Sequence, residues 1–168
     1  VECYRKYVDA GWAAVCGDTN YGGQGLPWTI SIALNEIWQS ANMSLANAWM
    51  LTQGAVEAIQ AHGTSAQKEA FLPKLISGEW SGTMNLTEPN AGSDVGALRT
   101  KAVAENGAWR ITGTKIFITH GDQDMSENVV HLVLARTPNA PQGTRGISLF
   151  VVPKILVNSE GELEQRND

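Results

Sequence analysis

The segment from Met84 to Asp94 contains residue types that suit the binding of an anionic group. A strand-like run ends here, Pro89 fixes a turn, and Gly92 and Ser93 follow directly. This order presents backbone N–H groups and a hydroxyl with little steric cover, and converging backbone donors form anion-binding nests. Many turns that contain Pro and Gly share part of this pattern, so these residues leave an anion site and an ordinary turn both open.

The run from Lys115 to Thr119 is a second candidate for chemistry. If it is a strand, alternate side chains share one face, which brings the aromatic ring of Phe117 and the hydroxyl of Thr119 together. An aromatic plane beside a hydroxyl suits a flat heterocycle. The alternative is a strand with Phe117 in the hydrophobic core, which the usual burial of Phe favours.

Other familiar catalytic and metal-binding motifs do not occur in the sequence. It contains no G-x-x-x-x-G-K-[ST], H-E-x-x-H, C-x-x-C or G-x-S-x-G pattern. His131 lies in an apolar run, which favours a packed strand residue over a ligand, and we predict no metal site. The glycine-rich residues 20–25 do not join a strand to a helix as a dinucleotide-binding turn does, so a loop is expected. Cys3 and Cys16 are interpreted as two reduced thiols without a defined role.

The composition limits the classes of partner. The chain has 168 residues, 12 Lys and Arg against 17 Asp and Glu, a formal net charge of −5 and 43% hydrophobic residues. This balance argues against binding to nucleic acid, which requires clustered Lys and Arg. No apolar run approaches the ~18 residues of a membrane helix, and no signal peptide is visible. We therefore expect no nucleic-acid or membrane partner and a cytoplasmic location.

The first part of the chain has a helical pattern. Apolar residues recur at helical spacing on both sides of an interruption at Asn42, and the second series ends at His62 and Gly63. Thr64 and Gln67 fit a capping box, which predicts the start of a further helix. The predicted helices cover residues 1–14, 30–41, 45–62 and 64–78, with Pro73 inside the last one and a loop over 17–27.

The second part has the pattern of short strands and turns. The predicted strands cover residues 84–87, 100–104, 108–112, 115–119, 128–136 and 146–152. Asn106 and Gly107 predict a hairpin turn, because both of its central residues take positive φ. The run 129–135 lacks alternation, which favours a strand covered on both faces. The predicted fold class is α+β, with a helical domain over residues 1–80 followed by a small antiparallel β-barrel or sandwich over residues 81–168.

The stretch from Thr87 to Asp94 resembles the T-E-P-x-A-G-S-D signature of the acyl-CoA dehydrogenase family. Further matches in the family's order lie at residues 21–25, 62–64, 67–68, 72–75, 78–79, 113–115 and 118–119. Residues 121–136 and 146–154 resemble the subgroup typified by 3-methylmercaptopropionyl-CoA dehydrogenase. The resemblance implies a helical domain, a middle β-domain and a C-terminal four-helix domain. The 168 residues match the first two in part and do not match the third.

The resemblance also implies FAD as the cofactor. The residues carried over from the family motifs as FAD contacts are Met84, Leu86, Thr87, Gly92, Ser93, Phe117 and Thr119. The first three would border the isoalloxazine, Gly92 and Ser93 would meet the pyrophosphate, and Ser93 would also lie near the acyl-CoA channel. Phe117 would pack against the flavin and Thr119 would bond near N5. Met84 stands where an aromatic residue is common, and Phe117 where many relatives have Trp.

The implied reaction is the α,β-dehydrogenation of an acyl-CoA thioester. The family's glutamate base comes from the C-terminal domain, so we assign no catalytic residue within these 168 and expect them to be inactive alone. Glu36 and Glu57 receive no role, and Glu88 is interpreted as a structural residue of its turn. The implied partners are an electron-transfer flavoprotein and further copies of the chain, in a dimer or tetramer. The alternatives are a flavin oxidase or monooxygenase of the same fold, or a relative that binds DNA or a protein without dehydrogenation.

Overall fold

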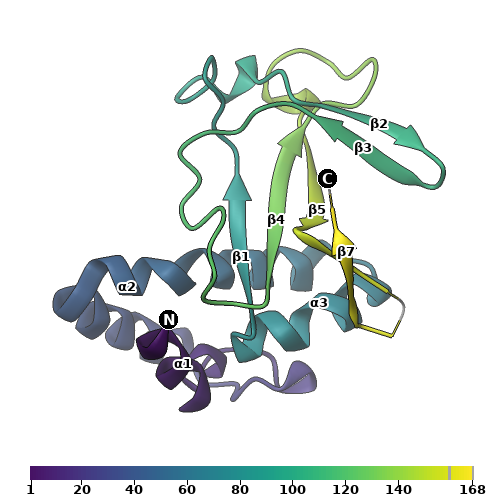
Figure 1. Cartoon of the computed structure of the whole chain (residues 1–168). Helices are drawn as coiled ribbons and strands as arrows, with labels where there is room; N and C mark the ends of the chain where they lie inside the picture. Colours follow the sequence, from purple (N-terminus) through teal and green to yellow (C-terminus); the bar gives the residue numbers. More distant parts are fainter. Residues whose placement is uncertain (159, 168) are drawn as a thin grey trace.

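The computed structural model describes residues 1–158 and 160–167, with helices first and strands after them (Figure 1). The helices are α1 (Glu2–Asp9), α2 (Trp28–His62) and α3 (Ser65–Ser77). The strands are β1 (Trp80–Asn85), β2 (Lys101–Glu105), β3 (Ala108–Thr112), β4 (Asn128–Ala135), β5 (Ser148–Pro153), β6 (Ile155–Val157) and β7 (Leu163–Arg166). Short 3-10 turns lie at Trp12–Ala14, Thr19–Tyr21, Val95–Ala97 and Thr144–Gly146. The predicted order of a helical part followed by a small β part is confirmed.

The long helix α2 changes direction at Asn42. Its φ of −161° and ψ of 93° lie outside the helical region, and its Oδ1 accepts a hydrogen bond of 3.0 Å from the Leu45 N–H. This is the bond of an N-cap side chain, so Asn42 begins the second half of α2 and explains the predicted interruption. The predicted opening helix over residues 1–14 is shorter, because α1 ends at Asp9 and Gly11 is left-handed at a φ of 76°.

The predicted capping box of α3 is confirmed. The Gln67 N–H donates to Thr64 Oγ1 over 3.2 Å, and the Thr64 N–H donates to Gln67 Oε1 over 2.9 Å. Pro73 lies inside α3, and Gly78 ends the helix at a φ of 86°. A left-handed residue suits glycine, which explains why α3 ends there.

The largest sheet has the order β1-β4-β5, with β4 in the centre (Figure 1). β4 is buried along most of its length, as its lack of alternation predicts. The expectation of a purely antiparallel domain was wrong: β4 is antiparallel to β5 but parallel to β1. β2 and β3 form the predicted hairpin, with Asn106 at a φ of 51° and Gly107 at 81°. β6 and β7 form a further antiparallel pair.

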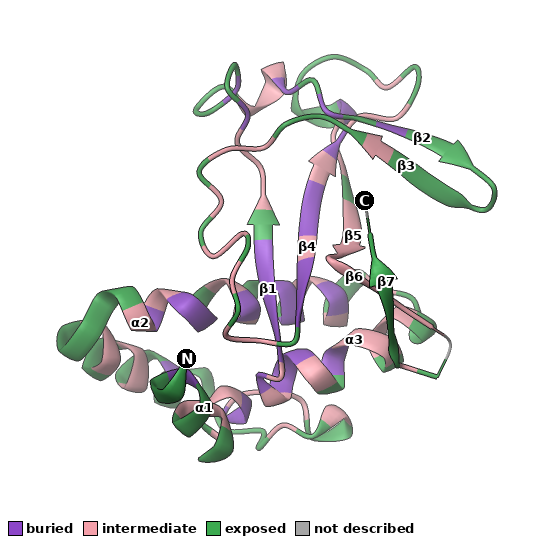
Figure 2. Ribbon diagram, viewed as in Figure 1, coloured by how far each residue is buried: buried purple, intermediate pink, exposed green. Residues whose placement is uncertain are grey.

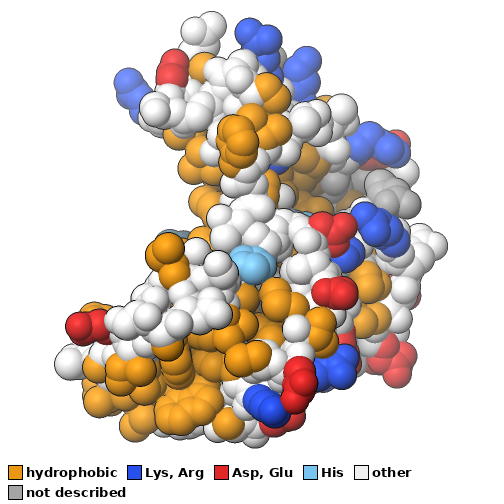
Figure 3. Space-filling model, turned by 60° about the vertical axis from the view of Figure 1, so that its left-hand side comes forward, with side chains coloured by type: hydrophobic (Ala, Val, Ile, Leu, Met, Phe, Trp, Pro, Cys, Tyr) orange, Lys and Arg blue, Asp and Glu red, His pale blue; other side chains and the backbone are white. Residues whose placement is uncertain are grey.

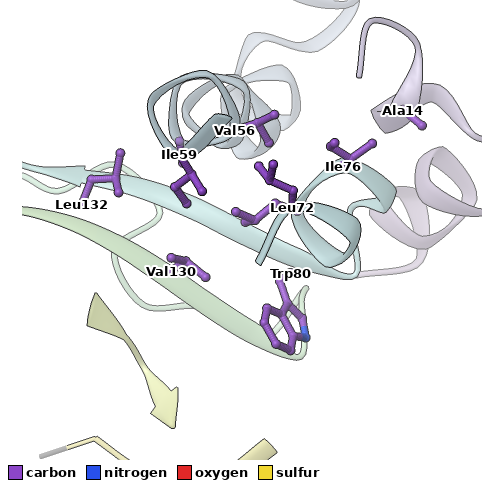
Figure 4. Packing of buried hydrophobic residues seen from close by; sticks show 10 residues of the cluster. Ala14, Val56, Ile59, Leu72, Ile76, Trp80, Val130 and Leu132 are labelled. Atoms are coloured by element: carbon purple, nitrogen blue, oxygen red, sulfur yellow. The ribbon is translucent and has the colours of Figure 1, made fainter. Parts of the chain in front are cut away.

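A hydrophobic core joins the helical part to the sheet. Side chains of α2 and α3 pack against β1 and β4 (Figure 4), and the buried residues concentrate along the same four elements (Figure 2). The labelled members are Ala14, Val56, Ile59, Leu72, Ile76, Trp80, Val130 and Leu132. Because this core fixes β1 on the helices, it determines where the chain emerges after Asn85. No helix among the described residues is long and apolar enough to cross a membrane.

Candidate functional site

The exposed end of β1 carries the first group of predicted site residues. Trp80 to Thr83 are buried, whereas Met84 is 38% exposed, and Leu86 and Thr87 are half-buried in the segment that follows. β1 has β4 as its strand partner, and within the described residues its other edge is unpaired. These three residues therefore lie at a margin of the sheet that pairs with no further strand, and the loop that follows β3 runs along this margin (Figure 1). Figure 3 shows the molecule from this side, hollowed between the helical part and the loops above it.

The turn after β1 presents Gly92 and Ser93 to solvent. Glu88 and Ala91 exchange two backbone hydrogen bonds of 3.0 Å, which closes the turn that the sequence predicts. A Cβ added at Gly92 would meet nothing nearer than Thr87 Cγ2, at 4.0 Å, so the backbone at Gly92 faces open space. The hydroxyls of Thr87 and Ser93 have no hydrogen-bond partner within the part of the chain that the structure describes. The turn can therefore offer donors to a ligand.

Glu88 lies beneath this turn and is only 4% exposed. Its carboxylate accepts hydrogen bonds from the Arg99 N–H (2.6 Å), the Thr100 N–H (3.0 Å) and Lys115 Nζ (2.9 Å). Burial by itself raises the pKa of Glu88, but the hydrogen bonds from Thr100, Arg99 and Lys115 outweigh it and lower the pKa to about 2. A carboxylate held ionised in this way is a poor general base. Glu88 therefore has a structural role, as predicted, but its side chain bonds distant segments and not only its own turn.

The strand predicted over residues 115–119 is absent, and Phe117 is neither on a strand face nor in the core. These residues form a loop in which Phe117 has a φ of 57° and is 88% exposed. The predicted strand and the burial of Phe117 in the core were both wrong, whereas a contact between Phe117 and a flat heterocycle stays a prediction. The reason is that the Lys115 ammonium is drawn inward to Glu88 and to the Leu86 carbonyl (3.0 Å), so the run does not alternate between two faces.

This loop lies directly against the segment that leaves β1. The Ile116 N–H donates to the Thr87 carbonyl over 2.9 Å, which places Phe117 next to Thr87. The structure thus brings together Met84, Leu86, Thr87 and Phe117, since the first three are close in sequence and the Ile116 bond adds Phe117. The open side of Gly92 faces the Thr87 methyl group. Thr119 is exposed further along the same loop, and no hydrogen bond joins it or Ser93 to the other described site residues.

Two basic residues that organise the site were missed from the sequence. One is Lys115, whose side chain is 9% exposed. The other is Arg136, whose guanidinium donates to the carbonyls of Gly96 and Leu98 and to those of Pro141 and Gly143. It ties the chain that follows the Gly92 turn to a second loop. An Arg at the end of a buried strand, directly before a Pro- and Gly-rich stretch, is the signal that could have indicated this role.

His131 is a packed strand residue, as the sequence predicts. The Thr83 hydroxyl donates to Asn85 Oδ1 over 2.7 Å, so it must accept from His131 Nδ1, also at 2.7 Å. Burial lowers the pKa of His131, while Asp122 and Lys154 act on it in opposite directions. No group of three His, Cys, Asp or Glu side chains among the described residues could hold a metal ion. Cys3 and Cys16 are free thiols.

A wide groove lies elsewhere, between the C-terminal end of α2, the β2–β3 hairpin and β5. It has a volume of about 1070 Å³, and Trp109 and Phe150 lie along it in edge-to-face contact, with ring centroids 5.3 Å apart. The predicted site residues do not line this groove. The two features are therefore separate.

Comparison with known protein families identifies the family of both the helical part and the β part. Residues 1–79 match the model "Acyl-CoA dehydrogenase, N-terminal domain", and residues 83–165 match "Acyl-CoA dehydrogenase, middle domain". The chain belongs to the acyl-CoA dehydrogenase family. The predicted resemblance is thereby confirmed, and the turn closed by Glu88 and Ala91 lies in the part that matches the middle domain.

Individual relatives within the acyl-CoA dehydrogenase family agree with this assignment. The chain is 54% identical over 165 residues to 3-methylmercaptopropionyl-CoA dehydrogenase of Ruegeria pomeroyi, which covers 98% of the chain and 28% of that protein. It is 43% identical over 167 residues to a butyryl-CoA dehydrogenase of Syntrophomonas wolfei, covering 98% of the chain and 27% of the relative. The chain thus spans little more than a quarter of the length of these relatives.

A solved acyl-CoA dehydrogenase structure has the same fold. The crystal structure of glutaryl-CoA dehydrogenase from Mycobacterium smegmatis superposes with a TM-score of 0.76 at 29% identity. The superposition covers 91% of this chain and 37% of the solved chain. The helical part and the small β part are therefore arranged as in a known acyl-CoA dehydrogenase.

Proposed function

We propose that the whole protein to which these residues belong catalyses the FAD-dependent α,β-dehydrogenation of an acyl-CoA thioester. The observation that supports this best is Phe117, a large aromatic residue held at a positive φ, 88% exposed, and fixed next to Thr87 at the end of β1. A bulky residue with positive φ is strained, and such strain concentrates at ligand sites. The family signature lies in the adjacent turn.

The residues present fit FAD. Met84 and Phe117 offer exposed apolar surface for a flavin ring, and the Thr87 hydroxyl beside them is without a partner among the described residues. Gly92 leaves room for close approach of a pyrophosphate, and the Ser93 hydroxyl and nearby backbone N–H groups can donate to it. When bound, FAD supplies the acceptor for the hydride that leaves the acyl β-carbon.

The chain's own residues then bind and orient rather than move the proton. Phe117 and Met84 would fix the plane of the ring, Thr87 and Thr119 would donate hydrogen bonds to its edge, and Ser93 would lie where the thioester enters. Glu88 is not the base, because its carboxylate is buried and fully hydrogen-bonded. We assign the base to a glutamate outside these residues, as the family resemblance implies.

An electron-transfer flavoprotein as electron acceptor, a homo-oligomeric assembly, a place in fatty-acid metabolism and a cytoplasmic location stay predictions. The alternatives of an oxidase, a monooxygenase or a DNA- or partner-binding relative are not favoured, because the similar proteins above are dehydrogenases by name. The substrate proposal covers acyl-CoA thioesters as a class.

An absorbance spectrum of the whole protein tests the proposal. We expect flavin bands that bleach when butyryl-CoA or 3-methylmercaptopropionyl-CoA is added without oxygen. A flavin that stays oxidised with both thioesters, or a protein without flavin bands, would contradict the proposal. Oxygen consumption during turnover, with no need for another acceptor, would support the oxidase alternative instead.

A further inference from the structure

The buried ion pair of Glu88 and Lys115 lies where the segments that carry the candidate flavin residues meet. The two side chains are 3% and 9% exposed, with a separation of 2.9 Å between Lys115 Nζ and Glu88 Oε1. Every other ion pair that the described residues form is more exposed, for example Lys74 with Glu79 on the surface near the end of α3, at 40% and 42%. This pair is therefore unusual within the molecule.

The hydrogen bonds of the pair end on three different segments. Lys115 Nζ donates to the Leu86 carbonyl, in the stretch that carries Met84 and Thr87. The Glu88 carboxylate accepts from the Arg99 and Thr100 N–H groups, where the chain returns from the Gly92 turn. Lys115 itself belongs to the loop of Phe117, and the next N–H, that of Ile116, donates to Thr87.

A buried pair of this kind is a weak source of stability. Removing two charges from water costs free energy that their attraction often fails to exceed, and apolar replacements are frequently tolerated. What the pair provides is geometry, because each bond fixes one segment against another. The positive φ of Phe117 also requires surroundings that hold the loop in place.

We propose that Lys115, held by Glu88, is a positioning residue that sets the orientation of Phe117 against the bound flavin. This inference rests on the proposed function. Lys115 acts on the flavin through Phe117, because it fixes the start of the loop two residues before Phe117. Without its ammonium, the Leu86 carbonyl and the Glu88 carboxylate each lose a partner, and the loop keeps the Ile116 bond as its attachment to this segment.

The first test compares Lys115→Met with Lys74→Met in the whole protein with FAD. Lys74 is the matched control, since it loses a solvent-exposed ion pair instead of a buried one. With whichever of the two acyl-CoAs bleaches the parent, we expect Lys115→Met to slow flavin reduction at saturating thioester by roughly tenfold to a hundredfold, since a misplacement of about 1 Å can cost a hundredfold in rate. The half-saturating thioester concentration should change little, and the flavin absorbance maximum should shift. Lys115→Arg should recover most of the rate, and Lys74→Met should resemble the parent.

The double variant Glu88→Gln/Lys115→Met separates positioning from folding, because it leaves no isolated buried charge. We expect it to unfold at a higher urea concentration than Lys115→Met and still reduce flavin slowly. Adding Phe117→Leu to Lys115→Met should slow reduction little further, since both changes act through one ring. A double variant that recovers the parent rate, or a Lys115→Met protein that reduces flavin at that rate, would overturn the inference while leaving the proposed function standing. A parent that lacks flavin or bleaches with neither thioester would instead contradict the proposed function.

Discussion

The Asn128 side chain makes hydrogen bonds to backbone groups, as a neighbouring strand would. Its substitution should therefore be among the most destabilising polar changes in the molecule. It is the first residue of β4 and is 1% exposed. Its Nδ2 donates to the Ile155 carbonyl over 3.0 Å, and its Oδ1 accepts from the N–H groups of Ile155 and Val129, both at 2.9 Å. One side chain thus joins the start of β4 to β6.

Asn128→Ala removes all three bonds. At about 1 kcal/mol net for each bond, we expect a loss of about 3 kcal/mol in the free energy of unfolding. The denaturation midpoint in urea should fall with an unchanged slope, which assigns the change to stability. Asn167→Ala is the matched control, because exposed Asn167 makes one side-chain bond, of 3.0 Å to the Pro153 carbonyl, and should lose less than about 1 kcal/mol.

Asn128→Asp provides an independent check through pH. The new carboxyl can donate to the Ile155 carbonyl only when it is protonated, and burial also disfavours its charged form. These two effects should outweigh the two N–H donors at Oδ1 and raise its pKa in the folded state. A raised pKa makes the variant more stable below the folded pKa and less stable as pH rises through it. We therefore expect Asn128→Asp to gain stability relative to the parent between pH 7 and pH 5. A cost for Asn128→Ala no larger than that for Asn167→Ala, or a pH-independent Asn128→Asp, would refute the reasoning.

Four further substitutions test other parts of the structure. Burial lowers the pKa of His131, so the neutral imidazole contributes its full stability above the ordinary pKa of about 6.5, and this contribution falls as the pH drops below that value. His131→Gln should therefore flatten the pH dependence of urea unfolding between pH 7.5 and 5.5. Glu88 has its pKa lowered from 4.5 to about 2, so about 3 kcal/mol of the free energy of unfolding, present above pH 4.5, should be lost as the pH falls toward 2. Acid unfolding of Glu88→Gln should lack this pH-dependent loss. Gly113→Ala places a Cβ 2.2 Å from Thr100 Oγ1 and should cost about 2 kcal/mol of stability by thermal unfolding. Gly92→Ala meets nothing closer than 4.0 Å and should keep its stability but retain less FAD on gel filtration; equal thermal stability of the two alanine variants would contradict the steric argument.

Local patterns predicted the helical part and the hairpin well because local chemistry decides them. The Asn42 interruption, the Thr64 capping box and the turn at Asn106 and Gly107 each depend on bonds or φ values within a few residues. The family signature likewise indicated the turn that the structure presents between β1 and the Phe117 loop.

The failures lie where distant residues decide the conformation. β1 starts at Trp80 instead of the predicted Met84. Ser81 and Gly82 show no strand-like apolar pattern, yet both are buried, Ser81 beside Gln123 and Ser126 and Gly82 against α2. The Gly82 N–H donates to Thr52 Oγ1, and a Cβ at Gly82 would lie 2.4 Å from that of Ala55. The alternation of the run that contains Phe117 indicated a strand, but the distant carboxylate of Glu88 draws Lys115 out of that pattern. The parallel pairing of β1 with β4 also has no local signature.

The central place of β4 constrains the order of events during protein synthesis. The helices and β1 leave the ribosome first, yet in the described structure β1 finds its strand partner only when Asn128 to Val133 have emerged, since Trp80 lies opposite Asn128 and Asn85 opposite Val133. Until then, Ile59, Leu72 and Trp80, which are at most 2% exposed in the folded chain, lack the β4 side of their core. Incomplete cores of this kind attract chaperones and aggregate. A nascent chain halted before Asn128 therefore presents a chaperone-binding surface, and one that has released β4 and β5 has buried it.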